Sequence, residues 1–280
     1  MREINANDIT ALVARMCIES NCYLNEDIEN ALKDGKAMET NPIASEILSD
    51  ILKNAEIARR DEVPICQDTG MAVFFLELGQ DVHISGGGLY DAINEGVRCG
   101  YRDGYLRKSV VADPIRRGNT NDNTPSIIHT EIVDGDGFKI TIAPKGFGSE
   151  NMSAVKMLKP SDGLEGVMNF VVSTVKEASG NPCPPIVVGV GIGGTMEKAA
   201  ILSKKALLRD IRESNPDEYY ADIEKELLER INALDVGPQG YGGITTALGV
   251  NVETFPTHIA GLPVAVNISC HVTRHMTREI

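Results

Sequence analysis

Apolar residues recur at helical spacing through most of the first sixty positions. One face of the first predicted helix consists of Ile9, Leu12, Val13, Met16 and Cys17. This helix is expected to begin at a cap on Asn7 or Asp8, because a short polar side chain there accepts a hydrogen bond from the first turn. Residues 25–36 and 42–60 show the same amphipathic pattern. The N-terminal third is therefore predicted to be helical.

The period of the pattern shortens after residue 66. Residues 71–78 are rich in strand-forming side chains and too few for a buried helix, so they predict a strand. A helix that starts at a glycine is predicted over residues 86–102. Strands over 126–134 and 137–144 follow, and the turn sequence Asp134-Gly135-Asp136-Gly137 between them favours a β-hairpin.

Helical and strand spacings alternate in the second half of the chain. The predicted elements are a helix over 161–179, a strand over 186–192, and helices over 195–212 and 217–233. Short apolar runs return around His258, Val264 and Cys270. No shift in composition marks a linker, so one mixed α+β domain over residues 1–280 is predicted. Its expected features are the helical N-terminal third, antiparallel strands and a glycine-rich strand-to-helix turn.

Charge and composition argue against several kinds of partner. The 280 residues include 27 Lys and Arg against 40 Asp and Glu, a formal net charge of -13 that disfavours nucleic acid and anionic membranes as partners. No run approaches the roughly 18 apolar residues of a membrane span, and the N-terminus lacks the apolar stretch of a signal peptide. A cytoplasmic protein with reduced thiols is expected, because disulfide frameworks are typical of small exported domains.

Three of the six cysteines lie in turn sequences beside apolar strands. These turns are Pro64-Ile65-Cys66-Gln67-Asp68, Asn181-Pro182-Cys183-Pro184 and Ile268-Ser269-Cys270-His271. Neighbouring prolines fix the backbone and hold a thiol at the end of an element, which suits a metal or iron–sulfur ligand. No local C-x-x-C spacing supports a shared site, so unconnected buried thiols are an alternative, as is zinc held together with His258 or His271. Cys17, Cys22 and Cys99 are predicted to be structural.

The run Gly189-Val190-Gly191-Ile192-Gly193-Gly194 fits the dinucleotide-binding pattern G-x-G-x-x-G between a strand and a helix. However, a second helix is predicted next, where a dinucleotide-binding unit needs a parallel strand that ends in an acidic residue. The sequence therefore favours a tight strand-to-helix turn that presents backbone N–H groups to an anion.

Basic residues stand out in the glycine-rich loops of this acidic chain. They are Arg107, Lys108, Arg116, Arg117 and Lys145. Each is either solvated surface charge or part of a site for an acidic substrate, since guanidinium groups bind carboxylates with two hydrogen bonds. His258 is a core histidine or a proton-transfer group, and Asp68 is a turn former or a catalytic carboxylate.

Five motifs occur in a fixed order along the chain. They are Ile65-Cys66-Gln67-Asp68-Thr69-Gly70, Leu106-Arg107-Lys108-Ser109-Val110-Val111, Lys145-Gly146-Phe147-Gly148-Ser149-Glu150-Asn151, Gly189 to Thr195, and Thr257-His258 through Cys270-His271. Together they resemble the α part of class I fumarate hydratases and related tartrate dehydratases. The resemblance spans nearly the whole chain, and several ordered motifs are far more specific than any single one.

This resemblance implies an oxygen-sensitive [4Fe–4S] cluster as the cofactor. The three cysteines that match the family's ligands are Cys66, Cys183 and Cys270. One iron is then left without a protein ligand and is able to act as a Lewis acid on a 2-hydroxy acid. A rival of another class is a structural or electron-transfer iron–sulfur subunit, whose cluster has four protein ligands.

The same matching implies which residues meet the substrate. Gln67, Arg107 and Gly148 fall at substrate-binding positions of the family, with Arg107 gripping a carboxylate, and Asp68 and His258 fall in its proton-handling neighbourhood. The expected reaction is the reversible hydration of fumarate to (S)-malate. The alternative is dehydration of tartrate to oxaloacetate, because both reactions use a dianionic acid and differ by one hydroxyl on the substrate.

Two positions depart from the family, and the chain is shorter than its single-chain members. Phe147 stands where glycine is common, which would reshape the pocket, and Lys108 stands where proline is common, which a surface turn should tolerate. The sequence ends ten residues after Cys270, where single-chain members continue into a second domain. The resemblance therefore implies a separate β subunit, with further dimerisation of the αβ unit.

Overall fold

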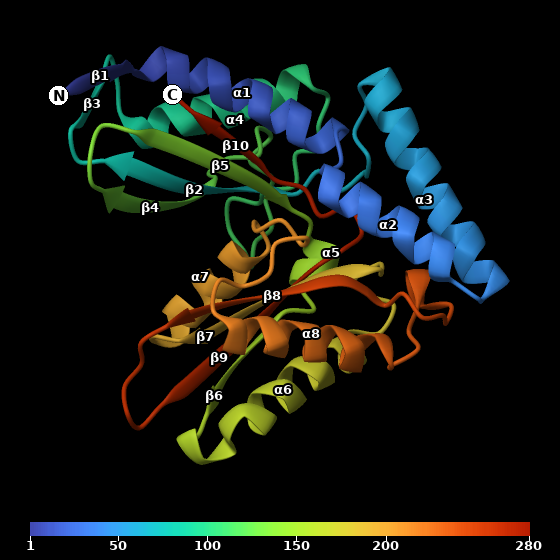
Figure 1. Ribbon diagram of the computed structural model, residues 1–280. Coiled ribbons are helices and arrows are strands. Elements are labelled where there is room, and N and C mark those ends of the chain that lie inside the picture. The colour runs from blue at the N-terminus through green and yellow to red at the C-terminus, as the bar shows by residue number, and fades with distance from the viewer. The chain divides into compact units, whose positions relative to one another are not determined.

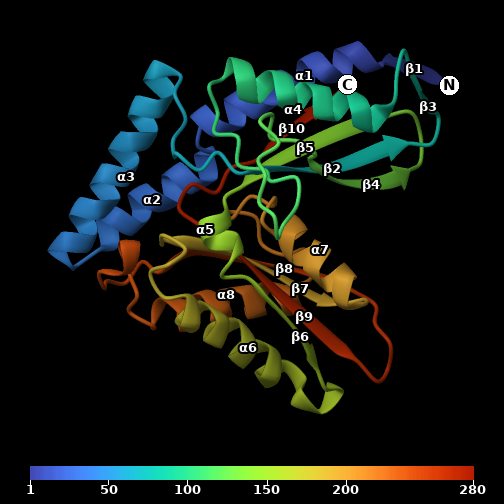
Figure 2. The same ribbon diagram turned by 180° about the vertical axis from the view of Figure 1, so that it is seen from behind.

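The computed structural model describes residues 1–280 and divides them into two compact units (Figures 1 and 2). The first unit consists of Met1–Leu24, Ala55–Phe147 and Arg274–Ile280, and the second of Asn25–Asn54 and Gly148–Thr273. The fold is α+β with helices in the N-terminal third, as predicted. None of the helices combines the length and the apolar character that crossing a membrane requires. Folding of both units as one domain stays a prediction.

The first unit is built on a sheet with the strand order β10-β5-β2-β4. Its strands are β2 (Met71–Gly79), β4 (Ile127–Val133), β5 (Phe138–Lys145) and β10 (Met276–Glu279), and a small parallel pair is formed by β1 (Arg2–Asn5) and β3 (Val82–Ser85). Helices α1 (Ala6–Cys22) and α4 (Leu89–Asp103) pack on each other and cover one face of the sheet (Figure 1). Val13, Phe74 and Ile140 are fully buried in this core.

The predicted hairpin between β4 and β5 is wrong. Strand β2 lies between these two strands, parallel to β4 and antiparallel to β5. The turn over residues 134–137 does reverse the chain, but its carbonyls accept hydrogen bonds from the segment at the end of β2. Gly79 N–H donates to Gly137 O (2.8 Å), and Asp81 N–H donates to Gly135 O (3.0 Å). Strand β2, which comes earlier in the sequence, therefore occupies the position beside β5 that the turn sequence predicted for β4.

Three predicted boundaries also need correction. The cap of α1 is Asn5, whose side chain accepts from Asn7 N–H (2.9 Å), and not Asn7 or Asp8. The helix predicted from residue 86 begins at Leu89, because Gly86 has φ +77° and Gly88 is the N-cap with an extended backbone (φ -77°, ψ 137°). The helix predicted over 195–212 ends at Ala206, where the buried Asn251 amide donates to Ala206 O (3.0 Å) and to a carbonyl in the turn that follows.

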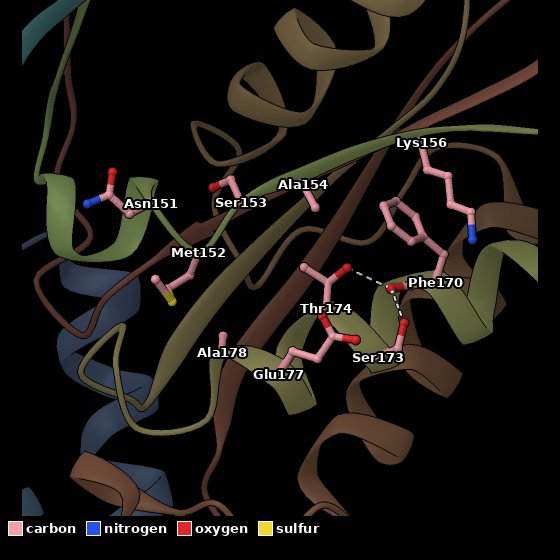
Figure 3. Close-up of a pocket in the computed structure, with 10 residues that line it drawn as sticks. All are labelled: Asn151, Met152, Ser153, Ala154, Lys156, Phe170, Ser173, Thr174, Glu177 and Ala178. Carbon is pink, nitrogen blue, oxygen red and sulfur yellow. Dashed lines mark hydrogen bonds between the residues drawn. The ribbon is translucent and has the colours of Figure 1, made fainter. Parts of the chain in front are cut away.

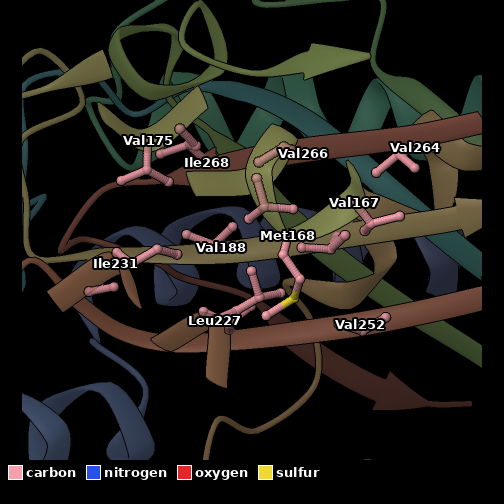
Figure 4. Packing of buried hydrophobic residues seen from close by; sticks show 14 of the residues in the cluster. Val167, Met168, Val175, Val188, Leu227, Ile231, Val252, Val264, Val266 and Ile268 are labelled. Carbon is pink, nitrogen blue, oxygen red and sulfur yellow. The ribbon is translucent and has the colours of Figure 1, made fainter. Parts of the chain in front are cut away.

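The second unit is built on a sheet with the strand order β6-β9-β7-β8. Its strands are β6 (Ala154–Leu158), β7 (Ile186–Gly193), β8 (Ala247–Phe255) and β9 (Leu262–Ser269). Its helices are α2 (Glu26–Met38), α6 (Gly163–Ala178), α7 (Met196–Ala206) and α8 (Glu218–Asn232), with α3 (Pro42–Asp61) and α5 (Phe147–Glu150) divided between the units and 3-10 turns at Pro160–Asp162 and Pro238–Gly240. Helices α6 and α8 bury Met168 and Leu227 against one face of the sheet (Figure 4).

Glycines on β7 allow α7 to pack directly on the other face of this sheet. A Cβ on Gly189 would stand 2.0 Å from Ser203 O, and one on Gly191 would stand 2.1 Å from Ala199 O. Any larger residue would therefore push the helix away from the strand. The predicted strand-to-helix turn is confirmed, with Thr195 as the cap of α7, and the two glycines have a packing role that accounts for the first half of the motif.

Candidate active site

The sequence-predicted site residues are distributed over both units. Cys66, Gln67, Asp68 and Arg107 belong to the first unit, and Gly148, Cys183, His258 and Cys270 belong to the second. Each group has its own local framework.

In the first unit, the segment from Cys66 to Gly70 forms a tight turn between α3 and β2. The Asp68 carboxylate anchors this turn, because Oδ1 accepts from Gly70 N–H (3.0 Å) and Oδ2 accepts from Phe147 N–H (2.9 Å). Gly70 has φ +74°, and a Cβ there would stand 2.7 Å from the Lys145 backbone, so only glycine fits. Asp68 is therefore a turn former. A proton-transfer role for it stays a prediction.

Side chains from three other elements bind successive carbonyls of this turn. Arg274 Nη2 donates to Asp68 O (2.5 Å), and Asn123 Nδ2 donates to Gly70 O (3.2 Å). The Tyr101 hydroxyl lies 2.8 Å from Thr69 O and 3.1 Å from Gly70 O. Burial raises the pKa of Tyr101, so its hydroxyl stays protonated and donates. The backbone beside Cys66 is thus fixed from behind by α4, by the segment before β4 and by the segment before β10.

Arg107 is held next to this turn by its backbone. Thr69 Oγ1 donates to Arg107 O (3.1 Å), while the Arg107 side chain is exposed. Lys108 is also exposed, as expected of a surface turn, whereas Lys145 is only 5% exposed and is not solvated surface charge. Arg107 and Gln67 are both exposed, and a guanidinium and an amide are groups that can bind a carboxylate.

In the second unit, strand register brings Cys183 and Cys270 to the same edge of the sheet. Cys183 precedes β7, Cys270 follows β9, and these antiparallel strands pair Val187 with Ser269. His271 strengthens the connection, because its Nδ1 lies 2.9 Å from Cys183 O and its N–H donates to the same oxygen (3.4 Å). Two cysteines that are 87 positions apart in the sequence are therefore neighbours in the fold.

The remaining cysteines have a different character. Cys17 and Cys22 are buried, and burial raises the pKa of each thiol, which disfavours the thiolate that a metal binds. Their prediction as core thiols is confirmed. Cys99 is half-buried on α4, where its Sγ contacts Glu95 Oε1 (3.4 Å).

The chemistry of the donor set fits a thiolate-ligated group. Cys66 and Cys270 are half-buried and Cys183 is exposed, whereas Cys17 and Cys22 are buried. No group of three or more His, Cys, Asp or Glu side chains is close enough in this structure to hold a metal ion. A single cluster shared by the three cysteines stays a prediction.

Gly148 lies within α5, two residues before Glu150, whose contacts hold this short helix in place. Space beside it is open, since a Cβ there would meet no atom within 4 Å. Glu150 accepts from Lys204 Nζ (2.6 Å) and from Asn267 Nδ2 (3.1 Å), so α7 and β9 both hold the segment that follows Gly148. Phe147, the departure from the family pattern, is 49% exposed.

His258 lies in the exposed loop between β8 and β9, where its Nδ1 accepts from Ala260 N–H (3.1 Å). It is not a core histidine. Because it precedes β9 and Cys270 follows the same strand, roughly 25 Å of extended backbone separates them. The second unit therefore does not bring His258 to its two cysteines, and the proton-handling role implied for His258 stays a prediction.

A pocket of about 370 Å³ lies between β6 and α6 of the second unit (Figure 3). Its hydroxyls already have partners, since Ser173 and Thr174 both donate to Phe170 O (3.0 and 2.8 Å) and Ser153 Oγ accepts from Ile268 N–H (3.1 Å). Lys156 Nζ lies over the Phe170 ring, 5.8 Å from the ring centroid. None of the predicted site residues lines this pocket.

The ordered motifs and the cysteine-bearing turns agree with a comparison to protein families. The model of the family described as fumarate hydratase (fumerase) matches residues 10–279. This chain belongs to the fumarate hydratase family. The match covers nearly every element of both units, so the resemblance inferred from the sequence is confirmed.

Three curated relatives that resemble this chain are named as the α subunit of L(+)-tartrate dehydratase, one of them as putative. A protein of Methanocaldococcus jannaschii named "Putative L(+)-tartrate dehydratase subunit alpha" is 44% identical over 279 residues, which are 97% of each chain. The L(+)-tartrate dehydratase subunit alpha of Escherichia coli strain K12 is 33% identical over 274 residues, 97% of this chain and 90% of its own. The corresponding protein of strain UTI89 is 32% identical over 277 residues, 98% and 91% of the two chains.

Sequence reasoning missed the residues that hold the site from behind. Tyr101, Asn123 and Arg274 are separated from Asp68 by 33 to 206 positions, so no local pattern connects them to its turn. One signal was present. Arg274 is the only arginine between Cys270 and β10, and it directly follows the segment with Val272 and Thr273, which are also buried.

Proposed function

We propose that this chain is the α subunit of a two-subunit hydro-lyase that reversibly hydrates fumarate to (S)-malate. Membership in the fumarate hydratase family and the "subunit alpha" names of its relatives support the proposal. The observation that carries it is the anchored turn of the first unit, where Cys66, Gln67 and Asp68 follow one another and Thr69 binds the Arg107 backbone.

Binding of a dicarboxylate is assigned to groups that are exposed. Arg107 would take one carboxylate through two parallel N–H donors, an arrangement that also selects its plane. The Gln67 amide would orient the other end of the substrate or its hydroxyl. Gly148 would let the substrate approach the backbone closely, because the space beside its Cα is open.

Cys66, Cys183 and Cys270 would hold the [4Fe–4S] cluster that the family resemblance implies. When bound, it would supply a Lewis acid that makes the hydroxyl of a 2-hydroxy acid a better leaving group. Cys17 and Cys22 are not suited to this chemistry, since both are buried and burial raises the pKa of each thiol.

Proton handling is assigned to Asp68 and His258, following the family resemblance. Asp68 is fixed by two backbone N–H groups, so it would present one constant geometry to a substrate proton. His258 is exposed, and its Nδ1 accepts from Ala260 N–H. Replacing His258 with Gln should lower kcat, and an unchanged kcat would remove it from the site.

Tartrate dehydration to oxaloacetate is the second candidate reaction. The names of the relatives that are 33% to 44% identical favour it. In both cases we propose a cytoplasmic enzyme with a separate β subunit and further dimerisation of the αβ unit. The substrate differs only by a hydroxyl, which groups of the pocket must bind or exclude.

Steady-state kinetics of the anaerobically purified complex decide between the reactions. Turnover of fumarate and malate with little turnover of tartrate supports the first proposal, and the reverse supports the second. A complex that turns over none of these acids would favour a structural or electron-transfer subunit. Metal and sulfide analysis of the same sample separates iron–sulfur from zinc.

A further inference from the structure

Arg274 is a buried cation whose hydrogen-bonding capacity is mostly unused. It is 5% exposed, and its Nη2 donates to Asp68 O (2.5 Å). Its Nε and Nη1 have no hydrogen-bond partner. The charge lies close enough to Cys22 and Tyr101 to lower the pKa of each, although burial outweighs this effect and raises both.

Stability alone does not account for such a residue. Taking a guanidinium out of water costs several kcal/mol, and a single hydrogen bond to a neutral carbonyl does not offset this. An apolar side chain of similar length would fill the same space with no charge to bury. Arg278, in the neighbouring strand, shows the usual arrangement, since it is 47% exposed and pairs with Glu19.

The one bond that Arg274 makes is to the backbone of the candidate site. Asp68 O belongs to the turn that presents Cys66 and Gln67, and the following two carbonyls are bound by Tyr101 and Asn123. Three successive carbonyls are thus held from behind by side chains that do not extend to the exposed edge. Only Arg274 among them is charged, and a charged donor makes the stronger bond.

We propose that Arg274 is a positioning residue that fixes the turn carrying Cys66, Gln67 and Asp68. The proposal deepens the proposed function and rests on it, because the turn matters only if Cys66 is a ligand and Gln67 and Asp68 meet the substrate. Arg274 acts through Asp68 O and contacts neither substrate nor cofactor. Its effect on the site is to fix the position of the turn, and the folded protein accommodates the buried charge.

Hydrogen exchange measured on the full chain in its complex tests this directly. Gly70 N–H, which donates to Asp68 Oδ1, reports on the turn. In Arg274→Met, exchange of the peptide around residues 64–70 should accelerate roughly tenfold or more, the scale of one charge-assisted hydrogen bond, while α4 and β5 peptides stay at the wild-type rate. Iron retention under anaerobic dialysis should fall with it.

Two further variants make the result decisive. Arg274→Lys keeps the charge and a group that can donate to Asp68 O, so it should fold like the wild type and lie between it and Arg274→Met in both measurements. Arg278→Gln, the matched exposed arginine, should behave as the wild type. Wild-type exchange in the turn of both Arg274 variants, or equal acceleration throughout the first unit, would overturn the proposal.

A failure of the proposed function is distinguishable from a failure of the proposal for Arg274. A wild-type complex without cluster and without hydro-lyase activity would refute that function, whereas the exchange rates of the turn would still decide whether Arg274 holds it.

Discussion

Replacing Asn123 with Ala should destabilise the first unit and loosen the loop that carries Arg107. Asn123 is completely buried and has φ +62°. Its Oδ1 accepts from Ser109 N–H (2.7 Å) and Val110 N–H (3.3 Å), and its Nδ2 donates to Gly70 O (3.2 Å). One side chain therefore ties the Arg107 loop to the Cys66 turn.

The size of the effect follows from these contacts. Each of the three hydrogen bonds contributes about 1 kcal/mol, and the buried Val110 N–H loses its acceptor, which adds about 1 kcal/mol more. Alanine in a left-handed conformation costs about 1 kcal/mol. Gly70 O keeps the Tyr101 hydroxyl at 3.1 Å, so it adds no further penalty. The expected loss is about 3 to 5 kcal/mol.

Asn121 provides a matched control in the same loop. It is exposed and has φ +66°, so Asn121→Ala pays the conformational cost and little else. The difference between the two variants isolates the buried contacts, at about 2 to 4 kcal/mol.

Urea unfolding followed by far-UV circular dichroism measures both losses, since the chain has no tryptophan to follow by fluorescence. The Asn123 variant should also raise KM for dicarboxylates more than it lowers kcat, because the Arg107 loop loses its tether. Equal stability losses in the Asn123 and Asn121 variants would refute the reasoning.

Three further outcomes are expected. Arg107→Ala should keep the cluster and lower kcat/KM for dicarboxylates on the order of a hundredfold, about 3 kcal/mol, whereas Lys108→Ala should behave as the wild type; kinetics of the complex measure both. Cys183→Ser should abolish cluster retention, measured as iron and sulfide under anaerobic conditions. Partial burial acts to raise the pKa of Asp122, but hydrogen bonds from Thr124 lower it to about 2, so this carboxylate stabilises the fold above its unfolded pKa near 4 and the gain is lost as the pH falls toward 2. Asp122→Asn should therefore flatten the loss of stability between about pH 5 and 2 in acid titrations.

Elements that depend on local spacing are predictable from this sequence. The long amphipathic helices α3 and α8 form where the pattern places them. The strand β2 also agrees to within a residue. Apolar periodicity fixes these segments because their buried faces are continuous in sequence.

Strand order needs information that local spacing does not contain. The Asp134-Gly135-Asp136-Gly137 turn is compatible with a hairpin, but β2 competes for the same pairing and wins through two ladders. The short strands β1 and β3 carry four residues each, which is too few for a period to emerge. Tertiary pairing decides such elements.

The candidate site likewise combines local features, which the sequence predicts, with long-range pairings, which it does not. The motifs make Cys66, Asp68 and Arg107 candidates because each lies in a short stretch of sequence that resembles the family pattern. The register of β7 and β9, which joins Cys183 to Cys270, depends on a pairing across more than eighty residues. The hydrogen bond from Arg274 to Asp68 O also joins residues that are far apart in the sequence, by 206 positions.

The most direct test of the account is the iron and acid-labile sulfide content of the anaerobically purified complex in four cysteine variants. Cys66→Ser, Cys183→Ser and Cys270→Ser should each lose the cluster, while Cys99→Ser, the half-buried control, should keep about four of each per chain. Full iron and sulfide in any one of the first three variants, or their loss from the control, would contradict the assignment of this ligand set.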